Sequence, residues 1–283
     1  MMRDYFELTK PRIVLLVLIT ATIGYYLGGQ GIHSYVRLFY LLLGTSLVCG
    51  GSAVLNHYLE RDTDNLMNRT RKRPLPAGRI EPRRALQFGI LISLLGIFVL
   101  YTKLNILTAF LGLLTNFMYV LVYTPMKKVS WWNTTIGAFP GAMPPLGGWA
   151  AATGHLNFDA GILFLILFIW QHPHFYAIAW MFREDYRNAG FKMLPGREHD
   201  GWDLFHQIQC YSILLIPVSL IPAVTGLSGF IYLLGAFVTG LWMLCVSLQF
   251  IRSESLLDAR RLLKATVIYL PILLTLIIVD ARF

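Results

Sequence analysis

Long apolar runs recur along the whole chain and are separated by short polar connections. With about 20 apolar residues per membrane span, the pattern predicts nine helices, near residues 13–29, 38–59, 85–101, 105–123, 133–152, 160–181, 205–226, 229–250 and 262–279. The fifth contains Pro140, Pro144 and Pro145, and we expect a kink there because proline removes a backbone donor. The first run has spanning length and no convincing cleavage site, which favours a membrane helix over a signal peptide.

The distribution of lysine and arginine orients these spans, because cytoplasmic loops carry the excess of positive charge. With a cytoplasmic N-terminus, the N-terminal segment and segments 61–84, 127–128, 183–197 and 252–264 lie inside and hold 21 of the 24 basic residues. The outside segments hold only Arg37, Lys103 and Arg282. We therefore expect an all-α polytopic membrane protein, a bundle of nine transmembrane helices with its N-terminus in the cytoplasm and its C-terminus outside.

Composition agrees with a membrane protein. The chain is 56% hydrophobic and 14% charged, whereas soluble domains carry about 25% charged residues. The net charge of +9 comes from loops on one membrane face without a recognition motif, so we expect no nucleic-acid partner. The three cysteines stand singly in apolar segments, without the spacing of a metal site or a disulfide framework. No linker divides the chain, and we interpret residues 1–283 as one domain.

Polar side chains gather where the second span ends. Asn56, Glu60 and Asp64 follow one another at intervals of four, so on a continuous helix they share one face over about 12 Å, while Asp62 points elsewhere. A carboxylate at mid-bilayer costs roughly 3 kcal/mol, so the cluster must lie at the boundary, in a wet cavity or beside cations. One interpretation is a helix end frayed into solvent, with its acids paired to the nearby basic residues Arg61, Arg69, Arg71, Lys72 and Arg73.

A second cluster follows the sixth span. His172 and His174 lie within that span, and Arg183, Glu184 and Asp185 come at its end, on the same predicted side of the membrane as the first cluster. Two converging carboxylate clusters suit Mg²⁺, which takes oxygen ligands from one or two carboxylates together with substrate phosphates. The pattern predicts a site for Mg²⁺ and an anionic diphosphate, with basic side chains on the phosphate oxygens.

Five segments carry a family resemblance: LTKPRIVLL at 8–16, NHYLERDTDNLMNRT at 56–70, YTPMKK at 123–128, GAFPGAMPPLGGWAAATG at 137–154 and PHFYAIAWMFREDYRNAGFKMLP at 173–195. Together they resemble the intramembrane prenyltransferase superfamily typified by UbiA. Within it they are most similar to the haem-modifying branch, the protohaem IX farnesyltransferases or haem O synthases. Two departures are Glu60, where the family usually has aspartate, and Gln171-His172 before Pro173-His174, where Pro-Pro-His is usual.

The resemblance implies a nine-helix bundle that transfers a farnesyl group from farnesyl diphosphate to the vinyl group of haem B, giving haem O and diphosphate after water adds. It implies Mg²⁺ ligation, directly or through water, by Asn56, Glu60, Asp62, Asp64, Glu184 and Asp185. It implies diphosphate binding by Arg69, Arg73, Lys127, Lys128 and Tyr123. The residues expected to be catalytic are Asp64, Asp185 and His174.

The acceptor and the prenyl chain need an apolar pocket with aromatic faces, where a ring stabilises a cation by up to about 2 kcal/mol. The candidates, by closeness to the acidic motifs, are His57, His172, His174, Phe175, Tyr176, Tyr119 and Trp180. The histidines could ligate the haem iron, or His174 could act as a base near the acceptor. Packing or an interfacial belt is the usual role of membrane aromatics and stays open for each ring.

Mg²⁺ is the expected cofactor, and the expected partners are farnesyl diphosphate, haem B, the lipid bilayer and a downstream haem A synthase or terminal oxidase assembly. We expect a multi-pass protein of a prokaryotic cell membrane with its active site on the cytoplasmic side. One alternative is a polyprenyltransferase acting on an aromatic quinone precursor, such as hydroxybenzoate or a naphthoate, or on a lipid glycerol. Another is a membrane transporter, which would place its polar groups near the bilayer centre and often repeats its broken helices.

Overall fold

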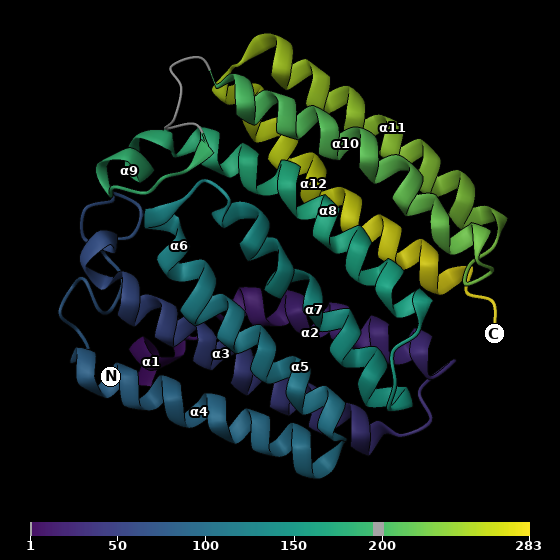
Figure 1. Cartoon of the computed structure of the whole chain (residues 1–283), viewed down its shortest axis with the longest axis horizontal. Coiled ribbons are helices and arrows are strands. Elements are labelled where there is room, and N and C mark those ends of the chain that lie inside the picture. Colours follow the sequence, from purple (N-terminus) through teal and green to yellow (C-terminus); the bar gives the residue numbers. More distant parts are fainter. Residues whose placement is uncertain (1, 195–200) are drawn as a thin grey trace.

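The computed structural model describes residues 2–194 and 201–283. Within them the regular secondary structure is helical apart from one isolated antiparallel bridge between Ser228 and Ala281, and turns and loops join the helices. Pro195 and Arg197, which belong to the predicted motif and inside segment, lie outside the described residues. The helices, labelled in Figure 1, are α1 (Met2–Leu8), α2 (Pro11–Gly28), α3 (Tyr35–Asp64), α4 (Pro82–Lys103), α5 (Ile106–Phe117), the π-helix η1 (Met118–Tyr123), α6 (Thr124–Val129), α7 (Asn133–Thr153), α8 (Phe158–Met181), α9 (Arg183–Asn188), α10 (Trp202–Val224), α11 (Phe230–Ser253) and α12 (Leu256–Val279).

Eight helical segments among the described residues are long and apolar enough to cross a membrane: α2, α3, α4, the continuous run Ile106–Val129, α8, α10, α11 and α12. The fifth predicted span, α7, is a 21-residue helix that is not among these eight, because its prolines and glycines dilute its apolar content. The all-helical architecture predicted from the sequence is confirmed for the described part of the chain. The count of nine spans and the orientation of the termini stay predictions.

The three prolines of α7 do not end the helix, which runs without interruption from Asn133 to Thr153. Neighbouring side chains bond to its carbonyl groups. Gln171 Nε2 donates to the Ala138 carbonyl at 3.2 Å, and Asn105 Nδ2 donates to the Ala150 carbonyl at 2.7 Å. These bonds join α7 to α8 and to the start of α5. The carbonyls that the prolines leave without a backbone donor are others, those of Ile136, Pro140 and Gly141.

Short polar side chains and prolines determine where several helices begin. Ser34, Asn105, Asn157 and Ser255 accept backbone N–H groups in the first turns of α3, α5, α8 and α12, at 2.8 to 3.3 Å. These caps satisfy donors that have no partner inside the helix. Pro11 begins α2, where a missing N–H is harmless.

Glycines allow the N-terminal helices to approach closely. A methyl group at Gly24 of α2 would overlap the Pro145 carbonyl of α7, and a methyl group at Gly148 of α7 would overlap the Ala21 carbonyl of α2. Gly51 of α3 lies in the same way against α4. Small residues at helix contacts are typical of membrane bundles, because they bring backbones into van der Waals contact.

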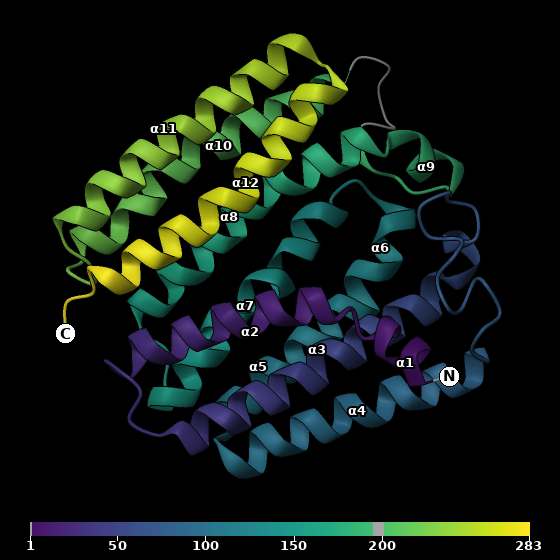
Figure 2. The ribbon, with the colours of Figure 1, turned by 180° about the vertical axis from the view of Figure 1, so that it is seen from behind.

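The connections gather at two opposite ends of the bundle (Figures 1 and 2). One end holds α1, the connection 65–81, α6, α9 and the turn between α11 and α12. The other end holds the turns after α2, α4, α7 and α10 together with the C-terminus. We call the first the charged end, because the described parts of the predicted inside segments lie there.

The largest apolar core lies among α8, α10, α11 and α12. Tyr232 and Tyr269 are fully buried in it. The Tyr232 hydroxyl donates to the Ser219 carbonyl, and the hydroxyls of Tyr269 and Ser219 share a hydrogen bond, both at 2.7 Å. The buried phenols are therefore satisfied, and this half of the bundle supports α8 and the short α9 that follows it.

Candidate functional site

The polar face of α3 reaches the charged end as a buried row. Asn56, Glu60 and Asp64 are 1%, 6% and 1% exposed, and α3 stays helical as far as Asp64. The interpretation of this segment as a frayed, solvated helix end is therefore wrong. Asp62 lies off the row, with its side chain 83% exposed and 3.7 Å from the Arg61 guanidinium.

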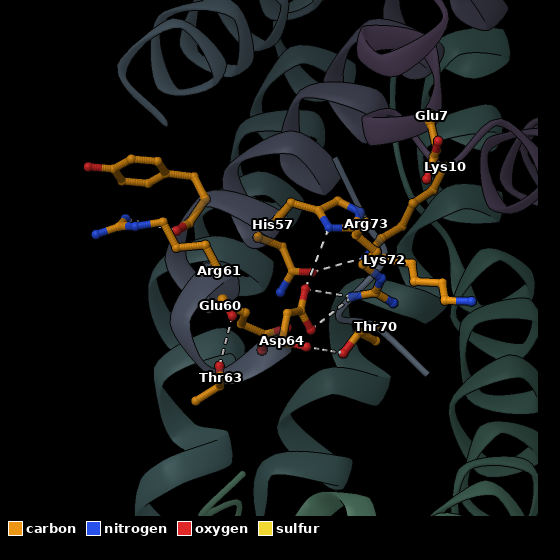
Figure 3. A network of polar contacts seen from close by, with 12 residues as sticks. Glu7, Lys10, His57, Glu60, Arg61, Thr63, Asp64, Thr70, Lys72 and Arg73 are labelled. Carbon is orange, nitrogen blue, oxygen red and sulfur yellow. Dashed lines mark hydrogen bonds and ion pairs between the residues drawn. The ribbon is translucent and has the colours of Figure 1, made fainter. Parts of the chain in front are cut away.

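Asp64 lies between a guanidinium and an imidazole (Figure 3). Arg73 Nη1 donates to both carboxylate oxygens, at 3.0 and 2.8 Å. His57 Nδ1 lies 3.7 Å from Oδ2 of the same carboxylate. The Asp64 backbone carbonyl accepts from Thr70 Oγ1 at 2.8 Å, which folds the following connection back against α3. A carboxylate this deeply buried is tolerated because a cation is paired with it.

Glu60 is paired with a lysine from another part of the chain. Lys127 Nζ on α6 lies 2.7 Å from Glu60 Oε1, and the same ammonium lies 4.6 Å from the Tyr123 ring centroid. The Lys127 carbonyl accepts from the backbone N–H of Lys192, which follows α9, at 2.7 Å. The pair therefore links α3, α6 and the segment after the second acidic motif.

Lys10 completes the row, although the sequence analysis gave it no role in the site. Its Nζ donates to Asn56 Oδ1 at 3.0 Å. Its backbone has φ 52° and ψ 58°, a left-handed conformation that is uncommon outside glycine, and it joins α1 to α2. Burial, together with the neighbouring Arg73 and Lys127, lowers the pKa of Lys10 to about 8. The one signal in the sequence was the Lys-Pro step immediately before the first span.

A π-helical turn shapes the wall beside this row. In η1 (Met118–Tyr123) the hydrogen bonds run one residue further than in an α-helix, and Pro125 follows it without an N–H to continue the regular pattern. Thr124 Oγ1 donates to the Tyr119 carbonyl at 2.8 Å and accepts from Asn56 Nδ2 at 3.1 Å. The turn thus fixes the amide of Asn56 and places Tyr119 beside the row.

The second acidic motif lies next to the connection after α3. Met67 from that connection shares a small buried cluster with Phe191, which follows α9. Glu184 is exposed and Asp185 partly exposed, so both have access to water at the charged end. The structure thus brings the flanks of the two motifs together, and the convergence of their carboxylates stays a prediction.

Arg69, one of the residues expected to bind diphosphate, makes its contacts away from the row. The Arg69 guanidinium lies 5.1 Å from the Phe182 ring centroid and donates to Tyr186 Oη at 3.4 Å. Lys128 is exposed. Arg69 therefore links the connection after α3 to the end of α8 and to α9, through a cation–π contact and a weak hydrogen bond.

The three candidate histidines do not lie together. His57 faces Asp64 within the row. His172 faces α7, with Nε2 3.3 Å from Thr135 Oγ1. His174 faces α12, with Nδ1 2.8 Å from Thr266 Oγ1. The three rings therefore face three different parts of the bundle.

The candidate aromatic residues of α8 also diverge. Phe175 lies edge-on to the neighbouring His174 ring. Tyr176 is 1% exposed within the large core. Trp180 packs against Phe205, with ring centroids 4.9 Å apart, and donates to the Glu254 carbonyl at 3.1 Å. Trp180 therefore has the environment of a packing residue of the α8–α10–α11 core.

The row is an oxygen-only donor set, which fits Mg²⁺ better than a softer metal. Its three members are the Asn56 amide and the carboxylates of Glu60 and Asp64, and each is paired with a different cation. Among the described residues, no three His, Cys, Asp or Glu side chains converge closely enough to hold a metal ion alone. A bound Mg²⁺ would therefore need phosphate oxygens and water as further ligands, which is its usual behaviour.

A bundle of membrane-length helices with buried oxygen donors and cations at one end is the architecture of a membrane-embedded enzyme for a substrate with an anionic headgroup. The chain belongs to the UbiA prenyltransferase family, which matches residues 17–270. It is 46% identical over 288 residues to a protein of Solibacter usitatus and 43% identical over 280 residues to one of Salinibacter ruber, with 99% of each chain covered in both cases. Both relatives are named protoheme IX farnesyltransferase.

Solved structures share the fold at lower identity. A digeranylgeranylglyceryl phosphate synthase matches with a TM-score of 0.84 at 19% identity, covering 99% of this chain and 98% of that one. A UbiA homolog from Archaeoglobus fulgidus bound to DMAPP and Mg²⁺ matches with a TM-score of 0.69 at 16% identity, covering 98% of this chain and 99% of that one. The bound DMAPP and Mg²⁺ are properties of that protein, and the likeness to this chain is one of fold.

Proposed function

We propose that this chain is a Mg²⁺-dependent protohaem IX farnesyltransferase. It joins the farnesyl group of farnesyl diphosphate to the vinyl group of haem B, releases diphosphate and gives haem O once water has added. The buried row on α3, in which each oxygen donor meets a cation, is the observation that supports the diphosphate chemistry. The choice of acceptor is supported by relatives that are 39% to 46% identical over almost the whole chain and carry this name.

The proposed reaction needs charge stabilisation where the allylic carbon–oxygen bond breaks. Asn56, Glu60 and Asp64, with Asp185 from α9, are the residues proposed to hold Mg²⁺, which when bound supplies positive charge to the departing diphosphate. Lys127 and Arg73 already lie at the row. They are proposed to turn from the carboxylates to the phosphate oxygens, so that charge stabilisation is built in before the bond breaks.

The test is conversion of haem B by the purified protein with farnesyl diphosphate and Mg²⁺, with the mass of haem O as the readout. We expect product from the intact chain and none after chelation of Mg²⁺. Parallel reactions offer hydroxybenzoate, a naphthoate or a glycerol lipid as the acceptor. Prenylation of one of these, without haem O, would assign the chain to the other acceptor class.

Carboxylate variants test the site assignment. Asp64→Asn and Asp185→Asn should each abolish product formation, because each removes a proposed cation ligand while keeping the side-chain size. Asp62→Asn is the matched control on the same helix, since its carboxylate is exposed and off the row, and it should retain activity close to the parent's. Full activity in the Asp64 or Asp185 variant would contradict the assignment of that residue.

We propose that the charged end faces the cytoplasm of a prokaryotic cell, in line with its basic residues. In a background without Cys49, Cys210 and Cys245, an impermeant maleimide should label Asp62→Cys only in inverted membrane vesicles. It should label Lys103→Cys, at the other end of the bundle, only in right-side-out vesicles. The reverse labelling would invert the proposed topology.

We propose that a haem A synthase or a terminal oxidase assembly consumes the product. Haem O has a long apolar tail, so direct transfer within the bilayer avoids exposing that tail to water. Co-purification from native membranes, with and without added farnesyl diphosphate, tests this association. If neither partner co-purifies even after chemical crosslinking of the membranes, haem O is released into the lipid instead.

A further inference from the structure

The two histidines of α8 use their ring nitrogens differently. His172 is fully buried, with Nδ1 2.8 Å from the Phe168 carbonyl and Nε2 3.3 Å from Thr135 Oγ1. Because a carbonyl only accepts, Nδ1 carries the hydrogen and Nε2 accepts from the threonine hydroxyl. Both nitrogens of His172 are engaged, so this ring offers no lone pair to a ligand.

Among the described residues, His174 has a hydrogen-bond partner for only one of its ring nitrogens. Its Nδ1 lies 2.8 Å from Thr266 Oγ1, and the Thr266 hydroxyl donates its single hydrogen to the Leu263 carbonyl at 2.7 Å. The hydroxyl oxygen therefore meets His174 with a lone pair, so Nδ1 is the protonated nitrogen and Nε2 keeps its lone pair. His174 is only partly buried, whereas Thr266 is fully buried.

Trp170 fixes the plane of the His174 ring. The two rings stack with centroids 5.1 Å apart at 24°, and Trp170 Nε1 donates to the Thr266 carbonyl at 2.8 Å. Thr266 of α12 thus acts twice: its hydroxyl orients the imidazole, and its carbonyl holds the indole that covers the imidazole. Histidines that bind metals are oriented in this way, with the second ring nitrogen in a hydrogen bond that fixes tautomer and direction.

We propose that Nε2 of His174 is the protein ligand to the iron of the haem acceptor and that Thr266 is the positioning residue that fixes this imidazole. The proposal rests on the proposed function, which supplies a metalloporphyrin. His174 lies seven residues before the end of α8 at Met181, about 10 Å of helix from the charged end. Ligation there would hold the porphyrin iron at this depth from the charged end.

The test compares two porphyrins that differ only in the metal. Iron protoporphyrin IX and metal-free protoporphyrin IX are titrated into the purified full chain in nanodiscs, with Soret absorbance as the readout. His174→Ala should weaken binding of the iron porphyrin by more than tenfold and shift its Soret band, while binding of the metal-free porphyrin stays at the parent's level. Added imidazole should restore the parent's Soret band.

The positioning role of Thr266 has its own variants. Thr266→Val removes the hydroxyl and should weaken iron porphyrin binding by roughly tenfold, whereas Thr266→Ser should restore it. Thr239→Val is the matched control, because Thr239 also donates to a carbonyl of its own helix but lies on α11. Retained binding of the metal-free porphyrin shows that each variant has folded.

Two results would overturn the proposal. One is an equal loss of both porphyrins in His174→Ala, because the ring would then only pack. The other is an unchanged Soret band in a His174→Ala protein that still binds the iron porphyrin. If the parent chain converts haem B to haem O in either case, the ligand assignment fails and the proposed function stands. If instead the parent chain binds iron porphyrin through His174 but never forms haem O, the proposed function fails and the ligand assignment stands.

Discussion

Replacing Arg73 with methionine should separate two roles of one cation. In the structure its Nη1 donates to both oxygens of the buried Asp64 carboxylate. Opposite charges about 4 Å apart attract by roughly 4 kcal/mol at an effective dielectric of about 20, and a buried charge that loses its partner costs about 3 to 5 kcal/mol. The Arg73 side chain is 24% exposed, so water replaces part of the interaction. We therefore expect Arg73→Met to lower the free energy of unfolding of the metal-free protein by about 2 kcal/mol.

The same substitution should change the binding of metal and of diphosphate in opposite directions. Without Arg73, Mg²⁺ no longer competes with a guanidinium for Asp64, so its affinity should rise by about tenfold or more, since 1.4 kcal/mol corresponds to tenfold. Inorganic diphosphate loses a bidentate partner and should bind more weakly. Adding Mg²⁺ should therefore recover the stability that the substitution removed.

Three measurements check this reasoning. Unfolding in sodium dodecyl sulfate, followed by tryptophan fluorescence, gives the stability with and without Mg²⁺, and calorimetric titrations give the affinities for Mg²⁺ and diphosphate. Arg71→Met is the control, because Arg71 belongs to the same connection and is exposed. A fall in Mg²⁺ affinity in Arg73→Met, or an unchanged stability, would refute the competition between Arg73 and the metal for Asp64.

Further changes test other parts of the bundle. Lys10, with its pKa lowered to about 8, should lose its charge as the pH rises from about 7 to about 9. Because this ammonium holds the amide of Asn56, a proposed Mg²⁺ ligand, the KM for farnesyl diphosphate should then increase in the parent. It should not increase in Lys10→Arg, which keeps its charge. Stability should move the other way and rise between about pH 8 and the ordinary lysine pKa, because the unfolded chain then binds more protons. Gly137→Ala should displace the Tyr123 ring, which a methyl group there would overlap, and raise that KM with little change in stability. Gly24→Ala meets the Pro145 backbone carbonyl instead and should lower the unfolding free energy by about 1 to 3 kcal/mol, measured by the same detergent titration.

The sequence determined the features that depend on local periodicity. The long helices followed from the lengths of the apolar runs, whereas the number of them that cross the membrane stays a prediction. The row of Asn56, Glu60 and Asp64 followed from their spacing of four, because a continuous helix puts such positions on one face. The same spacing argument separated Asp62, which is exposed in the structure. The distribution of lysine and arginine over the connections also predicted which connections share an end of the bundle, as Figures 1 and 2 show for the described residues.

Only the tertiary structure decided which groups meet. Lys10 is 46 residues from the Asn56 amide to which it donates, and it reaches that amide through a left-handed turn that no local pattern specified. His172 and His174 are neighbours in sequence, yet one turns to α7 and the other to α12, because residues two apart project from nearly opposite sides of a helix. Periodicity specifies the face of a helix on which a side chain lies, whereas its partner is fixed by the packing of distant segments, where a buried polar atom must find a complementary one.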